Sequence, residues 1–214
     1  MLILGHVSIT LGLGLLVDFS LRKKYGSAIG ETSVVTRKAN TTKKPPIANP
    51  PRGTMARFAV FMRRMDYRLL LLGSLLPDII DKPLGHLFFV GFFYNEGRLF
   101  AHSLLFLIII ISLGLGLYRR WGQQWLLILS FGTAVHLLLD EMWRTPGTVL
   151  WPFLGWGFEK EDAGNWWADI WHSLTAASPY TIATETIGVI ILVAFLAVLV
   201  RRKRLYAFIR YGRL

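Results

Sequence analysis

The sequence predicts an all-α integral membrane protein, a bundle of about five transmembrane helices of which one is broken at Pro77-Asp78. Two observations carry this prediction. Hydrophobic residues make up 53% of the 214-residue chain and the mean hydropathy is +0.46, which is too apolar for an ordinary soluble domain. Five stretches also approach the roughly 20 apolar residues that cross a bilayer. They are 2–21, 69–94, 99–118, 125–142 and 180–200.

The first two spans are the unusual ones. Span 2–21 lacks the basic start and the small-residue cleavage site of a signal peptide, so we interpret it as a retained helix. In span 69–94 the apolar run LLLLGSLLP is followed by Asp78 and Asp81, and Pro77 is expected to break the helix there. The remaining three spans are interpreted as continuous membrane helices.

Lysine and arginine are distributed unevenly along the chain. Of the 24 such residues, 12 fall in 22–68, two in 119–124 and six in 201–214. The positive-inside rule therefore predicts that these three segments are cytoplasmic, with the N-terminus outside and the C-terminus in the cytoplasm. We read the net charge of +11 as a topology signal. No base-reading module is recognisable, so no sequence-specific nucleic-acid binding is expected.

The polar segments subdivide a single membrane domain that comprises residues 1–214. The basic insert 22–68 contains a stretch rich in Pro, Thr, Asn and Lys, 36–54, which predicts disorder. It ends in a predicted amphipathic helix, 55–68, with arginines away from its apolar face. This helix and the basic tail 201–214 are expected to lie against anionic lipid of the cytoplasmic leaflet.

The segment 143–179 is predicted to form an outer, Trp-rich loop. It begins at Trp143 and holds five further tryptophans, at positions 151, 156, 166, 167 and 171. Indole side chains favour the headgroup level of a membrane, so we interpret these residues as an aromatic belt. A surface for a lipid substrate is the alternative interpretation.

Ionisable side chains gather at the predicted outer ends of the spans. Because charged groups at membrane depth are costly, a shared position favours a common function. The chain has no cysteine, so a metal site would use imidazole, carboxylate, backbone or water ligands. His136 and Asp140 are spaced i, i+4, which places them on one helical face within reach of a single divalent ion. The full set is His6, Asp78, Asp81, His102, His136, Asp140 and Glu185.

Several of these residues also have a purely structural interpretation. His86 and His172 are interpreted as interfacial side chains. Asp81 can pair with the adjacent Lys82 or cap a helix, and Glu185 can form a hydrogen bond between helices. The metal interpretation depends most on Asp78, His102, His136 and Asp140. Without a shared function, each of these four groups would separately cost free energy for its position at membrane depth.

Four stretches in order, GSLLPDIIDKP, GRLFAHSLLF, HLLLDEMW and LWPF, resemble the YdjM/YbcI family of membrane-bound, predicted metal-dependent hydrolases. The resemblance covers most of the chain apart from the insert 22–68 and the basic tail, and His6 in ILGHVSI also agrees with it. The chain departs from the family pattern Pro-Asp-x-Asp-His, because it has Pro-Asp-Ile-Ile-Asp-Lys. This difference removes one potential ligand and leaves the role of Asp81 open.

The order Asp, His, His-x3-Asp is also similar to the ligand order for one metal in zinc-dependent phospholipase C and related nucleases. This more distant resemblance implies that Asp78, His102, His136 and Asp140 share one ion. The terminal ligands of those enzymes have no clear match in this chain, and His6, a further candidate metal ligand, and Glu185 would fill part of their roles.

The resulting hypothesis is a membrane-embedded hydrolase that acts on a phosphoester or lipid headgroup at the outer face. Zinc is the first expectation for the divalent metal, and manganese or iron would also suit two histidines and two carboxylates. Asp81 or Glu185 would be the general base. Arg98 and Arg144 would bind an anionic group of the substrate.

Two other hypotheses remain open. In one, the protein is a non-enzymatic membrane scaffold or transporter, and the polar cluster is a structural metal site or a proton site. A transporter is less favoured because only one broken segment is visible and no paired repeat. In the other, the insert 22–68 is a cytoplasmic adaptor and carries the function itself.

Overall fold

The computed structural model describes residues 5–20, 65–85, 97–158 and 179–212. Every regular element within these ranges is helical, in agreement with the predicted all-α class. The first described element is the N-terminal helix, Gly5–Ser20. The elements that follow are α3 (Tyr67–Gly73), α4 (Leu76–Pro83), the 3₁₀ helix η2 (Phe100–His102), α6 (Leu104–Trp121), α7 (Trp125–Leu139), the 3₁₀ helix η3 (Met142–Arg144), α8 (Pro146–Val149), α10 (Pro179–Arg201) and α11 (Leu205–Tyr211).

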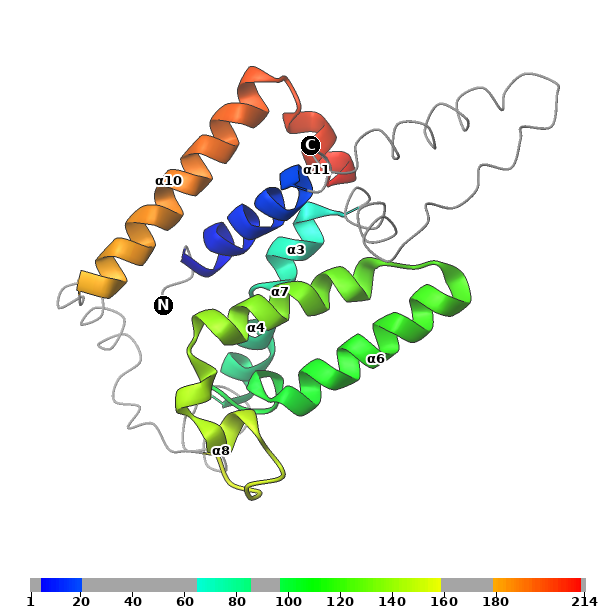
Figure 1. Ribbon diagram of the computed structural model, residues 1–214, viewed down its shortest axis with the longest axis vertical. Coiled ribbons are helices and arrows are strands. Elements are labelled where there is room, and N and C mark those ends of the chain that lie inside the picture. Colours follow the sequence, from blue (N-terminus) through cyan, green and yellow to red (C-terminus); the bar gives the residue numbers. More distant parts are fainter. Residues whose placement is uncertain (1–4, 21–64, 86–96, 159–178, 213–214) are drawn as a thin grey trace.

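Helices α6 and α7 form an antiparallel hairpin, and α10 lies apart from it (Figure 1). Helices α6 and α7 pack side by side, and Gly122 joins them in the left-handed conformation, with φ of 69°. Helix α10 runs past the N-terminal helix and leads into α11. By length and composition, the segments Leu104–Trp121 and Ile182–Arg201 can cross a membrane, whereas the N-terminal helix and α7 are shorter. Among the described residues, two of the five predicted spans therefore have a helix long enough to cross a membrane, and the bundle of five membrane helices is not confirmed.

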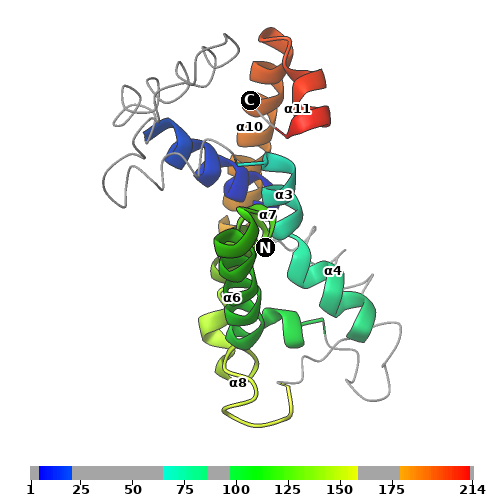
Figure 2. The same ribbon diagram turned by 90° about the vertical axis from the view of Figure 1, so that its right-hand side faces the viewer.

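The predicted position of the helix break is wrong by one turn. Helix α3 ends at Gly73 and α4 begins at Leu76, so the chain bends at Ser74–Leu75, as Figure 2 shows. Pro77 lies in the first turn of α4, where its missing N–H needs no partner within the helix. The proline therefore starts a helix here, and α4 carries both Asp78 and Asp81.

Two glycines allow α3 and α7 to cross with their backbones in contact. A Cβ atom on Gly73 would lie 2.4 Å from the carbonyl oxygen of Leu129. A Cβ atom on Gly132 would lie 2.6 Å from the carbonyl oxygen of Leu70. The hydroxyl of Thr133 donates a hydrogen bond to the Gly73 carbonyl at 3.2 Å. This close crossing brings the break after α3 against the last turns of α7.

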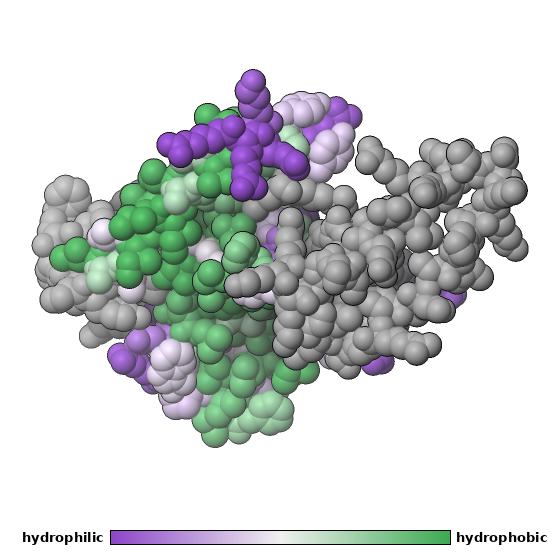
Figure 3. All heavy atoms as spheres, turned by 45° about the horizontal axis from the view of Figure 1, so that its top comes forward, coloured by the Kyte–Doolittle hydropathy of each residue, from purple (hydrophilic) through white to green (hydrophobic). Residues whose placement is uncertain are grey.

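The core lies between the N-terminal helix, α3, α7 and α10. Its buried members are Leu11, Met65, Tyr67, Leu70, Ile128, Phe195 and Leu199. Elsewhere the long helices expose apolar side chains: Ile108 and Leu113 of α6 are each 57% exposed. Figure 3 shows apolar side chains over much of the described surface in that view. Contact with lipid would remove such surface from water.

The tail predicted as a basic segment contains a short helix that packs back onto α3. The Tyr67 amide donates to the Gly212 carbonyl at 2.9 Å, and the Arg68 guanidinium donates to the Ile209 carbonyl at 2.7 Å. Asp66 caps α3 by accepting from the Arg68 amide. The insert 36–54, most of the predicted amphipathic helix 55–68, His86, His172 and Trp166, Trp167 and Trp171 of the outer loop lie outside the described residues.

Candidate metal centre

The C-terminal end of α7 supplies two of the predicted ligands. His136 lies in the last turn, and Asp140 is the C-cap, whose amide donates to the His136 carbonyl at 2.9 Å. Glu141 then adopts a left-handed conformation, with φ of 53°, which ends the helix. The i, i+4 spacing leaves His136 Nε2 3.9 Å from Asp140 Oδ2. Both side chains are buried, and His136 is fully so.

Asp81 holds His102 in one orientation. The Asp81 carboxylate is fully buried and accepts hydrogen bonds from the backbone amides of Leu99, Ala101 and His102 at 2.8–3.1 Å. It also lies 2.7 Å from His102 Nδ1. Because an ionised carboxylate can only accept, Nδ1 must carry the proton, and Nε2 faces away with its lone pair. Histidine ligands of metals are commonly oriented by a carboxylate in this manner.

The backbone at the break between α3 and α4 determines the orientation of the His136 imidazole. His136 Nδ1 lies 2.7 Å from the carbonyl oxygen of Ser74, which is also able only to accept. The proton of a neutral His136 therefore resides on Nδ1, and its Nε2 lone pair is directed at Nε2 of His102. These two atoms are 3.3 Å apart. Two lone pairs at this distance call for a cation or a shared proton between them.

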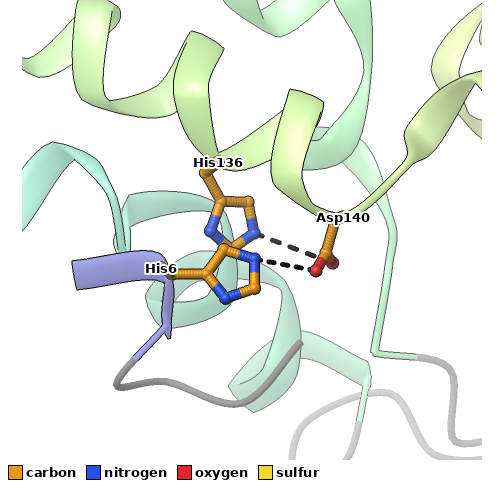
Figure 4. A group of neighbouring side chains, drawn as sticks. All are labelled: His6, His136 and Asp140. Atoms are coloured by element: carbon orange, nitrogen blue, oxygen red, sulfur yellow. Dashed lines mark ion pairs between the residues drawn. The ribbon is translucent and has the colours of Figure 1, made fainter. Parts of the chain in front are cut away.

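Two carboxylates complete the cluster. Asp78 Oδ1, from the first turn of α4, lies 3.6 Å from His102 Nε2 and 3.9 Å from His136 Nε2. On the other side of His136, His6 Nε2 lies 2.9 Å from Asp140 Oδ1. Figure 4 shows His6 reaching from the N-terminal helix toward the two α7 residues. His136 thus belongs to two overlapping groups, one with Asp78 and His102 and one with His6 and Asp140.

The outer oxygens of both carboxylates contact basic side chains. Lys82 Nζ lies 2.7 Å from Asp78 Oδ2, and Arg98 Nε lies 3.3 Å from Asp140 Oδ2. Lys82 is 38% exposed and Arg98 is 33% exposed, so this side of the cluster faces the surface. Lys82 is not among the site residues predicted from the sequence, in which it was a possible partner of Asp81. Its i, i+4 spacing from Asp78 is the signal that would have indicated the pair.

Two further residues selected from the sequence lie outside these groups. Glu185 of α10 accepts a hydrogen bond from the Gly5 amide at 3.0 Å, immediately before His6. Arg144 of η3 is 71% exposed and pairs with Glu141 at 2.9 Å. The structure therefore brings together His6, Asp78, His102, His136 and Asp140, with Asp81 and Arg98 in direct contact with members of this cluster.

The donor set fits a divalent transition metal. Ligand atoms held about 2.0–2.2 Å from a tetrahedral zinc ion are roughly 3.4 Å apart. The three separations among His102 Nε2, His136 Nε2 and Asp78 Oδ1 are 3.3, 3.6 and 3.9 Å. Imidazole nitrogens with carboxylate oxygens favour zinc, manganese or iron over calcium, which prefers oxygen ligands alone.

Comparison with known proteins identifies one family. Its model, described as YdjM inner membrane protein, matches residues 41–211, which include every residue of the cluster except His6. No curated protein and no solved structure matches the chain. Because the match covers well over half of the sequence, the chain belongs to the YdjM inner membrane protein family.

Proposed function

We propose that this protein is a metal-dependent hydrolase embedded in the membrane, with Asp78, His102, His136, Asp140 and His6 as its metal ligands. The observation that carries the proposal is the pair of imidazoles. Backbone and carboxylate acceptors hold the Nδ1 protons of both rings, so both Nε2 lone pairs converge at 3.3 Å beside Asp78. Buried groups that converge in this way without a cation would repel one another.

Zinc is the metal that best suits two imidazoles and nearby carboxylates, and manganese or iron is the alternative. A divalent ion in this place would activate water at neutral pH and polarise an ester oxygen. His136 belongs to both groups of ligand atoms, which leaves room for one ion or for two that share this residue.

The chain's own residues have separable roles. Asp81 is fully buried and already accepts from three amides and one imidazole, so we assign it the positioning of His102 in place of general-base catalysis. Glu185 holds the amide of Gly5 and thereby positions His6. We therefore propose positioning roles for both acids in place of the general-base role expected from the sequence.

The surroundings of the cluster favour an anionic substrate. Lys82 and Arg98 are partly exposed and contact the two carboxylates from the accessible side. A phosphoester approaching from that side would meet both cations, and an arginine can bind two phosphate oxygens at once. Arg144 is more exposed and is held by Glu141, so we expect it to contribute less to substrate binding.

The location of the cluster suggests the source of that phosphoester. We propose five membrane segments with the N-terminus outside and the C-terminus cytoplasmic, which places the cluster in the outer half of the membrane. The Trp-rich segment 143–179 would anchor this side at headgroup level. A lipid headgroup is then the substrate class within reach, and the basic insert and tail face anionic lipid on the opposite side.

Metal analysis of the purified full-length protein tests the site. We expect bound zinc, manganese or iron in the wild type and loss of it in His136→Ala, because this substitution removes a ligand common to both groups. His172→Ala, which changes a histidine interpreted from the sequence as interfacial, should retain the metal. If His136→Ala kept a full complement of metal, the assignment of the centre would be wrong.

A turnover screen on the same preparations tests the reaction. Phosphodiesters and phospholipids are the substrates to offer, and hydrolysis should disappear in His136→Ala and persist in His172→Ala. Bound metal without turnover of any substrate would favour the non-enzymatic alternative, a structural metal site. A wild-type protein that binds no metal would favour a proton shared between the two imidazoles.

A further inference from the structure

A groove of about 640 Å³ lies between the N-terminal helix and α10, and its lining includes no residue of the metal cluster. Each helix contributes residues of one face. From the N-terminal helix come Gly12, Leu15, Leu16 and Phe19, spaced i, i+3, i+4 and i+7. From α10 come Ile191, Ala194, Phe195, Val198 and Leu199, and Arg202 follows the end of that helix. The volume is in the range typical of ligand sites.

The groove is long, apolar and open along its side. From Ile191 to Leu199 it follows α10 for roughly 12 Å at the rise of an α-helix, about 1.5 Å per residue. Leu16 and Phe19 are 63% and 68% exposed, so the walls are not closed by other described parts of the chain. An elongated hydrocarbon chain matches this shape better than a compact polar ligand does.

One end of the groove is cationic. Arg202 and Arg204 line it where α10 ends, and both are exposed. Figure 3 shows strongly hydrophilic side chains gathered at this end beside the apolar surface. The single acid in the lining, Asp18, is 7% exposed and accepts from the Tyr67 hydroxyl at 3.2 Å, so its carboxylate is directed into the protein.

We propose that this groove binds one anionic phospholipid, with an acyl chain between the two helices and the phosphate on Arg202 and Arg204. Charge complementarity carries the choice of occupant: an apolar channel that ends in two arginines matches a hydrocarbon chain that ends in a negatively charged headgroup. The segment Ile182–Arg201 is long enough to cross a membrane, and its basic end lies where headgroups are expected. This site is separate from the metal cluster and does not depend on the proposed hydrolysis.

Native mass spectrometry of the full-length protein in detergent tests the proposal. The probes are dioleoyl phosphatidylglycerol and dioleoyl phosphatidylcholine, which share acyl chains and differ in net charge. The wild type should retain phosphatidylglycerol in preference to phosphatidylcholine. In Arg202→Gln/Arg204→Gln the affinity for phosphatidylglycerol should fall on the order of tenfold or more, because both cations beside the headgroup are removed.

Two further variants separate the groove from general charge effects. Arg119→Gln/Arg120→Gln removes the same charge from exposed positions at the end of α6 and should leave lipid retention unchanged. Ala194→Phe fills the groove wall at an exposed position and should weaken retention of both lipids. Arg204 makes no side-chain cap to α11, so its replacement should not unfold that helix, which thermal unfolding of every variant would verify.

Three outcomes would overturn the proposal. Equal losses in the two arginine double variants would reduce the effect to overall charge. Equal retention of the two lipids by the wild type would remove the anionic headgroup from the assignment. Unchanged retention by Ala194→Phe would show that the acyl chain lies elsewhere on the protein.

Discussion

At the end of α7 that carries His136, five imidazole and carboxylate side chains converge from four helical segments, whereas at the end of α10 four consecutive basic residues, 201–204, are all exposed. The buried set depends on partners: His6, His102 and His136 are 0–2% exposed, and each contacts a carboxylate. Exposed arginines remain hydrated and need no such partner. Substitutions that disturb packing near the first region should therefore have larger effects than changes at the second.

The largest effect is expected at the crossing of α3 and α7. In Gly132→Ala the new Cβ would lie 2.6–2.7 Å from backbone atoms of Leu70, Gly73 and Ser74, so the helices must separate. We expect destabilisation of about 1–3 kcal/mol, a typical cost of overpacking, together with weaker metal binding because the Ser74 carbonyl would leave His136. Thermal unfolding in detergent and metal analysis measure the two effects.

Gly116→Ala is the matched control for that variant. A Cβ atom at Gly116 meets no atom within 4 Å, and α6 should gain slightly in helix stability from the replacement. If the two glycine variants unfolded at the same temperature and bound metal equally, the close crossing would not be what positions His136.

The next effect concerns the orientation of His102. In Asp81→Asn the carboxylate that accepts four hydrogen bonds loses one acceptor oxygen, and the amide nitrogen would face a backbone N–H. We expect metal affinity to fall by about 10- to 100-fold, as for other partners that orient a ligand. Asp18→Asn alters a buried carboxylate that lines the lipid groove and should leave metal affinity unchanged. Metal titration of both variants tests this, and equal affinities would contradict the positioning role.

A smaller effect is expected where Glu185 holds the start of the N-terminal helix. Glu185→Gln keeps an oxygen that can accept from the Gly5 amide, and Glu185→Ala removes it. The loss of one hydrogen bond of about 1 kcal/mol should weaken metal binding roughly fivefold in the alanine variant and little in the glutamine variant. If Glu185→Gln abolished turnover while it retained the metal, Glu185 would be a general base after all.

The smallest effect is the pH dependence of stability that we expect from Asp66, which caps α3 close to α11. Burial raises the pKa of the Asp66 carboxyl, but the hydrogen bonds and charge of Arg68 outweigh this and bring the pKa below its ordinary value of 3.8. The stabilisation is thus present above the ordinary pKa and is lost as the pH falls through the lower pKa of the folded state. Thermal unfolding should show a slight loss below about pH 4 that is absent in Asp66→Asn. Identical pH profiles would exclude this contribution.

Local patterns in the sequence determined the helical class and the residue types of the candidate cluster. The i, i+4 spacing of His136 and Asp140 is a property of any α-helix, so their proximity follows from the sequence alone. The apolar runs likewise predicted helices, and the family match agrees with the resemblance seen in four short stretches. The position of the break could not be derived in this way, because a proline is compatible with both the end and the first turn of a helix.

Only the tertiary structure decided which acid meets which histidine. Asp78 and Asp81 lie one turn apart, yet Asp78 faces both Nε2 atoms, and Asp81 lies behind His102. His6 contacts Asp140, although most of the chain separates them in sequence. The Ser74 carbonyl reaches His136 because Gly73 and Gly132 allow the backbones of α3 and α7 to come into contact. Such contacts depend on the packing of helices that are distant in sequence, and local spacing carries no information about it. Sequence therefore determined which side chains were available, and helix packing determined how they meet.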